Sequence, residues 1–283
     1  MPGLDTHPPE LRRVRGHGGM PIAVWDYGGA GPPLLLCHCT GAAARVWDPV
    51  AAPLRNHYHV YALDNRGHGD SGRPRSREDC AWEFSGRDLL AAAGELGLGD
   101  GLYAAGHSGG AAQVGYAALY RPALFTRIAL IDGIIGPRRF FLEPPPLAEQ
   151  ARRRRARFEN RAAARNRLAA KPPMSHWHPD ALNAYISHAL RETGHTGAEL
   201  KCPPGVEAWM YEMGGACDLF ERMHEIAAEL LLVTGNDPKI NAVVRAQHAK
   251  LKRAELRVWH DTGHFIPQER PERTAALLAE WFG

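Results

Sequence analysis

Ser108 stands in the segment GHSGG, residues 106–110, with an apolar run before it and an alanine-rich stretch after it. The spacing G-x-S-x-G is typical of a nucleophile elbow, a sharp turn between a strand and a helix that lifts the serine hydroxyl out of the sheet. The segment LYAAG predicts the strand, and GGAAQVGYAALY predicts the helix. A plain turn rich in small residues is the alternative. The elements on both sides favour a nucleophile at Ser108.

A serine hydroxyl is a weak nucleophile, so a general base and a carboxylate that orients the base are expected nearby. His264 lies between the predicted strand AELRVW and the last predicted helix, on the same rim of a parallel sheet as Ser108. Asp237, in GNDPKI, follows the strand AELLLVTG and gives the chain order Ser, Asp, His, so we expect it to be the acid. Asp132, at the end of the strand RIALID, reaches the same rim and remains the alternative.

Two backbone N–H groups are expected to stabilise the oxyanion that forms when a serine attacks a carbonyl carbon. Gly109 follows the serine at a helix N-terminus, and Thr40 follows the predicted strand PPLLLCH. The N–H groups of both residues are therefore candidates for an oxyanion hole. As an alternative, Thr40 caps the helix that follows it.

A second glycine-rich loop, LDNRGHGDSGRP at 63–74, lacks the G-x-x-x-x-G-K-[ST] spacing of a phosphate-binding loop. Its glycines permit tight turns. We expect Asp64 and Arg66 in this loop to pair and to brace the rim.

These candidate residues lie at the ends of short apolar strands that alternate with helices. Such alternation predicts right-handed βαβ units and a mostly parallel central sheet flanked by helices. It stops near residue 137, and up to about residue 217 only helices and turns are expected. The predicted organisation is an α/β core formed by residues 1–137 and 222–283, with a helical cap, or lid, inserted at 138–221.

The predicted cap contains the run ARRRRARFENRAAARNR, residues 151–167. Nucleic-acid or membrane binding is one interpretation, but a formal net charge of +3 is small for 283 residues, so a solvated helix face is favoured. A further alternative is that one arginine faces the pocket and binds a substrate carboxylate.

The composition, with 45% hydrophobic and 23% charged residues, is that of an ordinary globular protein. The chain shows no apolar run near 18 residues and no apolar core of a signal peptide, so no membrane association is expected. Five cysteines, an odd number, favour reduced thiols and a cytoplasmic location over a disulfide framework. No nucleic-acid partner, metal or cofactor is expected, and the sequence leaves the oligomeric state open.

Taken together, these motifs make the chain resemble the α/β-hydrolase superfamily over its whole length outside the insertion. The matching segments, in chain order, are LLLCHCTG, LDNRGHGDSGRP, GHSGG, GNDPKI and TGHFIPQERPE. The resemblance implies a triad of Ser108, Asp237 and His264, and an oxyanion hole from Thr40 and Gly109. The chain departs from the usual pattern of the superfamily at two places. Cys39 stands before Thr40 where glycine is usual, and the GNDPKI loop is one residue shorter than usual. Because of this shorter loop, Asp132 remains the alternative for the triad acid.

The expected activity is that of a serine hydrolase that cleaves a small carboxylic ester or lactone through an acyl-enzyme. Carbon–carbon bond hydrolysis and cofactor-free haloperoxidase activity remain open, because members of the superfamily that do this chemistry have the same triad. A non-catalytic small-molecule binding protein is a hypothesis from another class. A pure binder has no need of all three triad groups, so their presence favours an enzyme.

Overall fold

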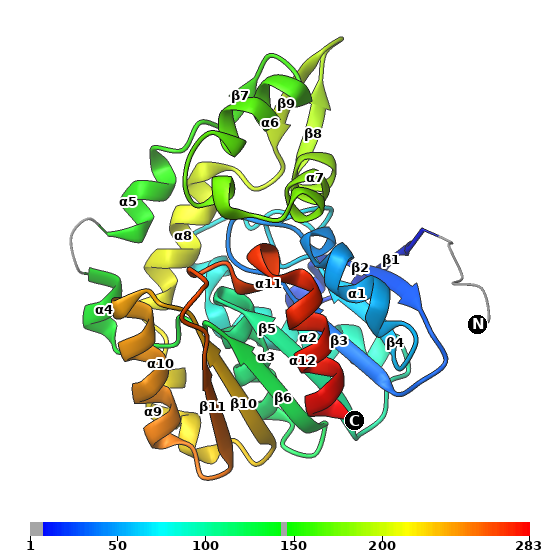
Figure 1. The fold of residues 1–283 in the computed structure, drawn as a ribbon, viewed down its shortest axis with the longest axis vertical. Helices are drawn as coiled ribbons and strands as arrows, with labels where there is room; N and C mark the ends of the chain where they lie inside the picture. Colours follow the sequence, from blue (N-terminus) through cyan, green and yellow to red (C-terminus); the bar gives the residue numbers. More distant parts are fainter. Residues whose placement is uncertain (1–7, 143–145) are drawn as a thin grey trace.

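The central element of the fold is an eight-stranded sheet, seen in a computed structural model that describes residues 8–142 and 146–283 (Figure 1). Its strands, in chain order, are β1 (Glu10–Arg15), β2 (Pro21–Gly28), β3 (Pro33–Cys37), β4 (His59–Leu63), β5 (Leu102–His107), β6 (Phe125–Ile131), β10 (Glu229–Thr234) and β11 (Ala254–Val258). Their spatial order is β1-β2-β4-β3-β5-β6-β10-β11. Only β1–β2 and β2–β4 pair antiparallel, and the other five pairs are parallel. The predicted mostly parallel α/β sheet is confirmed.

Helices cover both faces of this sheet, because successive side chains of a strand point to opposite faces. In β3, Leu34 and Leu36 face one hydrophobic cluster and Leu35 faces another, and all three are fully buried. The first cluster is closed by α1 (Asp48–Leu54) and α12 (Pro271–Phe282). The second is closed by three helices, α2 (Trp82–Glu95), α3 (Gly109–Tyr120) and α10 (Pro238–Lys250).

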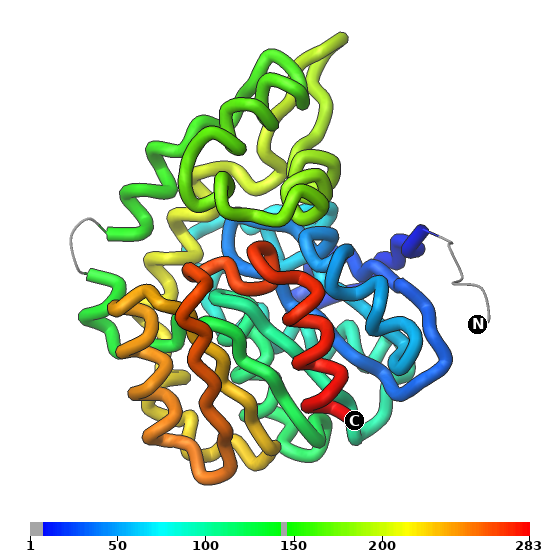
Figure 2. Tube along the Cα trace, in the orientation of Figure 1, coloured from blue at the N-terminus to red at the C-terminus, as the bar shows by residue number. Residues whose placement is uncertain are grey.

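Between β6 and β10 the chain leaves the sheet, rises above the carboxyl ends of its strands, and returns (Figure 2). The elements of this excursion are α4 (Arg138–Leu142), α5 (Leu147–Arg152), β7 (Arg157–Phe158), α6 (Arg161–Ala169), α7 (Pro179–His188), β8 (Leu190–Thr193), β9 (Gly197–Leu200), α8 (Pro204–Gly214) and α9 (Leu219–Arg222). In Figure 1, α5, α6, α7 and the small strands stand above the core, whereas α4 and α9 lie beside α10. We call the part that stands above the core the cap. The boundaries 138 and 221 of the cap remain a prediction.

The expectation that this insertion lacks strands is wrong, because β7, β9 and β8 form a three-stranded antiparallel sheet in that spatial order. These strands have only two to four residues each, and charged side chains occupy several of their positions. Gly194, with a φ of +58°, turns the chain between β8 and β9. Strands this short and polar give no apolar alternation that the sequence could reveal.

The described residues contain no helix that is both long and apolar enough to cross a bilayer.

Candidate active site

Ser108 occupies the tight turn between β5 and α3, as the sequence predicted. Its backbone has a φ of +56° and a ψ of −116°, a region that residues with a side chain rarely adopt. The neighbouring glycines allow this turn, because a Cβ on Gly106 would lie 2.4 Å from the carbonyl oxygen of Gly110. A Cβ on Gly110 would lie 2.3 Å from the carbonyl oxygen of Cys37. The turn therefore places the Ser108 hydroxyl at the carboxyl edge of the sheet.

A chain of hydrogen bonds connects Ser108 to a histidine and a carboxylate. The Oγ of Ser108 lies 2.9 Å from Nε2 of His264, and Nδ1 of His264 lies 2.7 Å from Oδ2 of Asp132. Because Nδ1–H donates to the carboxylate, Nε2 of the neutral ring is left to accept the serine proton. Asp132 is fully buried, and its Oδ1 accepts the N–H of Gly235 at 3.1 Å. This arrangement can transfer a proton from the serine hydroxyl to the imidazole.

The prediction that Asp237 partners His264 is wrong, and the alternative, Asp132, occupies that place. Asp237 is the N-cap residue just before α10, and its Oδ1 accepts the N–H groups of Lys239 and Ile240 at 2.9 and 3.0 Å. The loop after β10 is short, so the chain turns directly into α10 and the carboxylate is used as a helix cap. The shortened GNDPKI loop was the signal in the sequence for this outcome.

Thr40 and Gly109, the two predicted oxyanion donors, lie side by side next to Ser108. A Cβ on Gly109 would come within 2.3 Å of Thr40 Oγ1 and 3.6 Å of Thr40 N. Gly109 is the first residue of α3, so its N–H has no acceptor within the helix. In the described part of the chain, no acceptor is found for the N–H of Thr40. Both groups are available to an oxygen bound beside Ser108.

Two buried histidines hold the segment 38–41, which we call the oxyanion loop, against the core. Nε2 of His68 accepts the N–H of Gly41 at 2.9 Å, and its Nδ1–H donates to the carbonyl of Arg66 at 3.0 Å. Nε2 of His38 accepts the N–H of Asn65 at 3.0 Å, and its Nδ1–H donates to the carbonyl of Cys39 at 2.8 Å. Burial lowers the pKa of His38 to about 4 and the pKa of His68 to about 3, so both rings are neutral. Sequence reasoning missed the role of His68, whose only signal was its place among the glycines of loop 63–74.

The predicted Asp64–Arg66 pair in that same loop does not form. Arg66 pairs instead with the buried carboxylate of Asp88 in α2, with both contacts at 2.7 Å. Asp64 accepts the N–H groups of Ala44 and Asp70, at 2.7 and 3.0 Å. Burial raises the pKa of Asp64 to about 6, against the effect of these hydrogen bonds. The tight turn points the two side chains toward different neighbours, and each still braces the rim.

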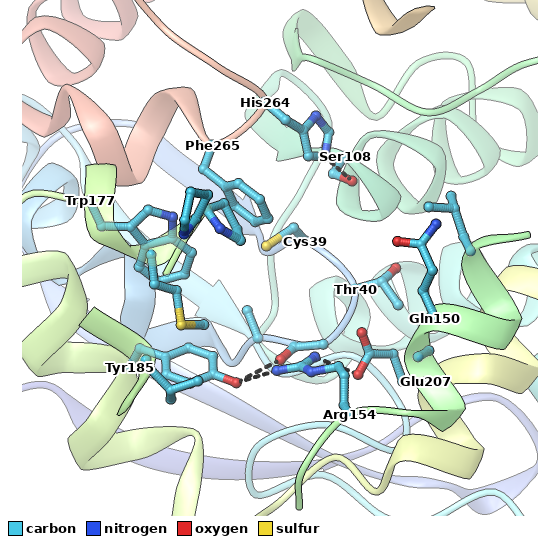
Figure 3. Close-up of a pocket in the computed structure, with 18 of the residues that line it drawn as sticks. Cys39, Thr40, Ser108, Gln150, Arg154, Trp177, Tyr185, Glu207, His264 and Phe265 are labelled. Atoms are coloured by element: carbon cyan, nitrogen blue, oxygen red, sulfur yellow. Dashed lines mark hydrogen bonds and ion pairs between the residues drawn. The ribbon is translucent and has the colours of Figure 1, made fainter. Parts of the chain in front are cut away.

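Three side chains of the insertion reach the oxyanion loop from the opposite side. The hydroxyl of Tyr185 in α7 donates to the carbonyl of Gly41 at 3.3 Å, and Nη2 of Arg154 donates to that hydroxyl at 2.9 Å. Arg154 also forms an ion pair with Glu207 of α8 (Figure 3). Gly41 has a φ of +82°, which favours glycine, and a Cβ there would lie 2.6 Å from both Arg154 Nη1 and Glu207 Oε1, so these two side chains approach the loop closely. The sequence pointed to an arginine facing the pocket, but not to Tyr185 or Glu207.

The pocket above Ser108 has a volume of about 580 Å³ and lies between the core and the cap. Ser108, His264 and Thr40 line it on the core side, and Figure 3 shows Arg154, Glu207 and Tyr185 at the end away from Ser108. Most of the remaining wall is apolar, formed by Leu147, Leu168, Met174, Trp177, Ile240 and Phe265. Such a cavity suits a small, partly apolar molecule with a few polar groups.

Comparison with known proteins agrees with the fold. The model of the alpha/beta hydrolase family matches residues 34–277. The abhydrolase domain-containing protein AKT2 of Alternaria alternata is 22% identical over 213 residues, which is 62% of this chain and 80% of that protein. The structure of E-2-(acetamidomethylene)succinate hydrolase is 20% identical, with a TM-score of 0.79 over 96% of this chain and 98% of that chain. A thermophilic esterase from Thermogutta terrifontis is 21% identical, with a TM-score of 0.72 over 96% of this chain and 97% of that chain.

Proposed function

This chain belongs to the alpha/beta hydrolase family, and on that premise we propose that it is a serine hydrolase that cleaves a small carboxylic ester or lactone. The observation that carries the proposal is the chain of hydrogen bonds from Asp132 through His264 to Ser108. A serine becomes a useful nucleophile only when a base takes its proton, and the base works best when a carboxylate fixes its ring. A protein that only binds its ligand has no need of this arrangement.

In the proposed reaction, the Oγ of Ser108 attacks the carbonyl carbon while its proton moves to Nε2 of His264. The carbonyl oxygen becomes an oxyanion that accepts hydrogen bonds from the N–H groups of Thr40 and Gly109. When the intermediate collapses, the carbon–oxygen bond of the ester breaks, and His264 returns its proton to the leaving alkoxide. Asp132 stabilises the imidazolium that exists between these two proton transfers.

The acyl group is then bound to Ser108 as an ester. A water molecule gives a proton to His264 as its oxygen attacks the acyl carbon, and the same two N–H groups stabilise the second oxyanion. Collapse releases the carboxylic acid, and His264 returns the proton to Ser108. The cycle consumes the ester and one water molecule, releases the alcohol and the acid, and restores the enzyme with no change of oxidation state.

The size and walls of the pocket support a small substrate. A volume of about 580 Å³ leaves room for a compound of modest size, and the apolar walls favour an acyl or alcohol part with hydrocarbon character. The similarity to a protein named an esterase supports the choice of esters as first substrates.

Covalent labelling by a neutral fluorophosphonate tests the proposal. The wild type is expected to label at Ser108 and to hydrolyse p-nitrophenyl esters, and Ser108→Ala to do neither. Ser187→Ala, which changes an exposed serine of α7, is the matched control and is expected to keep both labelling and activity. An unlabelled wild type, or equal labelling of Ser108→Ala, would contradict a serine nucleophile.

A further inference from the structure

Two cations border the pocket, and neither has a counter-ion among the residues that the structure describes. Arg167 lies in the last turn of α6, and Lys171 lies just beyond the end of that helix; both line the pocket and both are exposed. Neither side chain has an ion-pair or hydrogen-bond partner within residues 8–142 and 146–283. Because they are exposed and also line the cavity, they stand where the pocket meets solvent.

No other arginine of the run at 151–167 both lines the pocket and lacks a partner among the described residues. Arg154 also lines the pocket, but Glu207 already neutralises it. Arg165, in the same helix as Arg167, turns away from the pocket and donates to the side chain of Asn183 at 3.1 Å. Within the described part of the chain, the positive charge at the pocket that has no ion-pair partner therefore comes from Arg167 and Lys171.

Two like charges at the same opening repel each other, and this repulsion slightly disfavours their arrangement. A helix C-terminus attracts cations, which offsets part of the repulsion. It does not explain why both cations border the pocket. An anion bound between them would remove the repulsion and gain two charge-assisted hydrogen bonds.

The charge of the residues that line the pocket also favours an anionic ligand. Among the described residues that line it, three side chains are cationic and two are carboxylates. One carboxylate, Glu207, is paired with Arg154, and the other, Asp237, accepts two N–H groups at the start of α10. The described lining residues therefore carry one positive charge more than negative charges, and the two cations at the opening supply that excess.

We propose that the substrate carries a carboxylate at the end remote from its scissile carbonyl, and that Arg167 and Lys171 recognise this carboxylate. The inference rests on the proposed function, since it names the substrate class of the same site. The scissile ester lies at Ser108, the hydrocarbon middle lies along the apolar walls, and the carboxylate lies at the opening between the two cations.

The test compares pairs of esters whose two members differ only in charge. The acid esters are the monomethyl esters of succinic, glutaric, adipic and suberic acids, and each is paired with the methyl ester whose free carboxyl is replaced by a carboxamide of the same shape. Methanol release gives kcat/KM for each, and the ratio of acid ester to carboxamide ester is the readout. The variants are Arg167→Gln, Lys171→Gln and the double variant, with Arg165→Gln as the matched control on the same helix.

We expect the wild type to prefer the acid ester of at least one chain length. The preference is expected to fall about 10-fold in the double variant, to stay at the wild-type level in Arg165→Gln, and to decrease with added salt. Equal kcat/KM for the two esters in the wild type, an unchanged ratio in the double variant, or no hydrolysis of any acid ester would overturn the inference. Labelling of Ser108 in the wild type shows which proposal has failed. If only the carboxylate inference is wrong, Ser108 still labels, whereas a failure of the proposed function would abolish labelling as well.

Discussion

The oxyanion loop is held on its core side and on its cap side by groups of different kinds. On the core side, His68 binds the N–H of Gly41 with a neutral ring that is fully buried. On the cap side, Tyr185 binds the carbonyl of the same residue and is itself held by the ion pair of Arg154 and Glu207. The core contact requires an uncharged ring, whereas the cap contact relies on charges that are partly open to the pocket. The N–H of Thr40 is thus positioned by two regions that can be perturbed separately.

Breaking the core contact is expected to have the larger effect. His68→Leu removes the acceptor of the Gly41 N–H, which frees the loop that carries Thr40, and we expect kcat to fall about 10²-fold, as when an oxyanion donor is lost. His68→Gln retains a side-chain acceptor and is expected to recover much of kcat. Steady-state kinetics on p-nitrophenyl acetate measure both, and thermal melts confirm that both variants fold. A folded His68→Leu protein with wild-type kcat would show that the loop is held without this bond.

The buried histidines also predict how stability depends on pH. The pKa of His38 is lowered from 6.5 to about 4 and that of His68 from 6.5 to about 3, because burial disfavours the charged rings. Below pH 6.5 the unfolded chain binds protons that the folded chain does not, so this stability is present above pH 6.5 and is lost as pH falls toward 4 and 3. Each ring is expected to contribute about 2 kcal/mol to the loss of unfolding free energy by pH 5.

Urea unfolding of the wild type and of His68→Gln at neutral pH and at pH 5 measures this contribution. Other groups titrate in the same range, so the difference between the two proteins isolates His68. The wild type is expected to lose more stability than the variant. An equal loss in the two proteins would mean that His68 is not buried as a neutral ring.

Breaking the cap contact is expected to have the smallest effect. Tyr185→Phe keeps the aromatic ring and removes only the hydroxyl that binds Gly41, so we expect kcat to fall about 3- to 10-fold, the value of one hydrogen bond. Because the hydroxyl acts on the loop, the loss should be the same for acid and carboxamide esters and should appear in kcat with little change in KM. A loss confined to KM, or to one substrate class, would instead place the Tyr185 hydroxyl in direct contact with the substrate.

Local patterns predicted the core of the fold well because its strands are buried on both faces. Leu34, Leu35 and Leu36 form an apolar run that has few alternatives to a buried strand. The strands of the cap are short and carry charged residues, and β7 joins them through pairing between residues far apart in the chain, as between Arg157 and Glu199. Such pairing leaves no periodic signal in the sequence.

In the candidate site, too, local motifs predicted some residues, whereas others depend on contacts between distant parts of the chain. Ser108 and the segments around Thr40 and His264 carry local motifs, and the structure brings them together as expected. The choice between Asp132 and Asp237 depends on how far the chain runs before the next helix, which a motif does not encode. The link between Tyr185 and Gly41 joins residues 144 positions apart, and neither residue is unusual in its own segment.

Which carboxylate serves His264 is tested by comparing kcat for Asp132→Asn and Asp237→Asn. Asp132→Asn leaves the ring of His264 without a carboxylate, and a loss of about 10⁴-fold in kcat is expected. Asparagine caps a helix about as well as aspartate, so Asp237→Asn is expected to lose about tenfold or less. If Asp237→Asn instead suffers the larger loss, the proposed triad of Ser108, His264 and Asp132 is wrong.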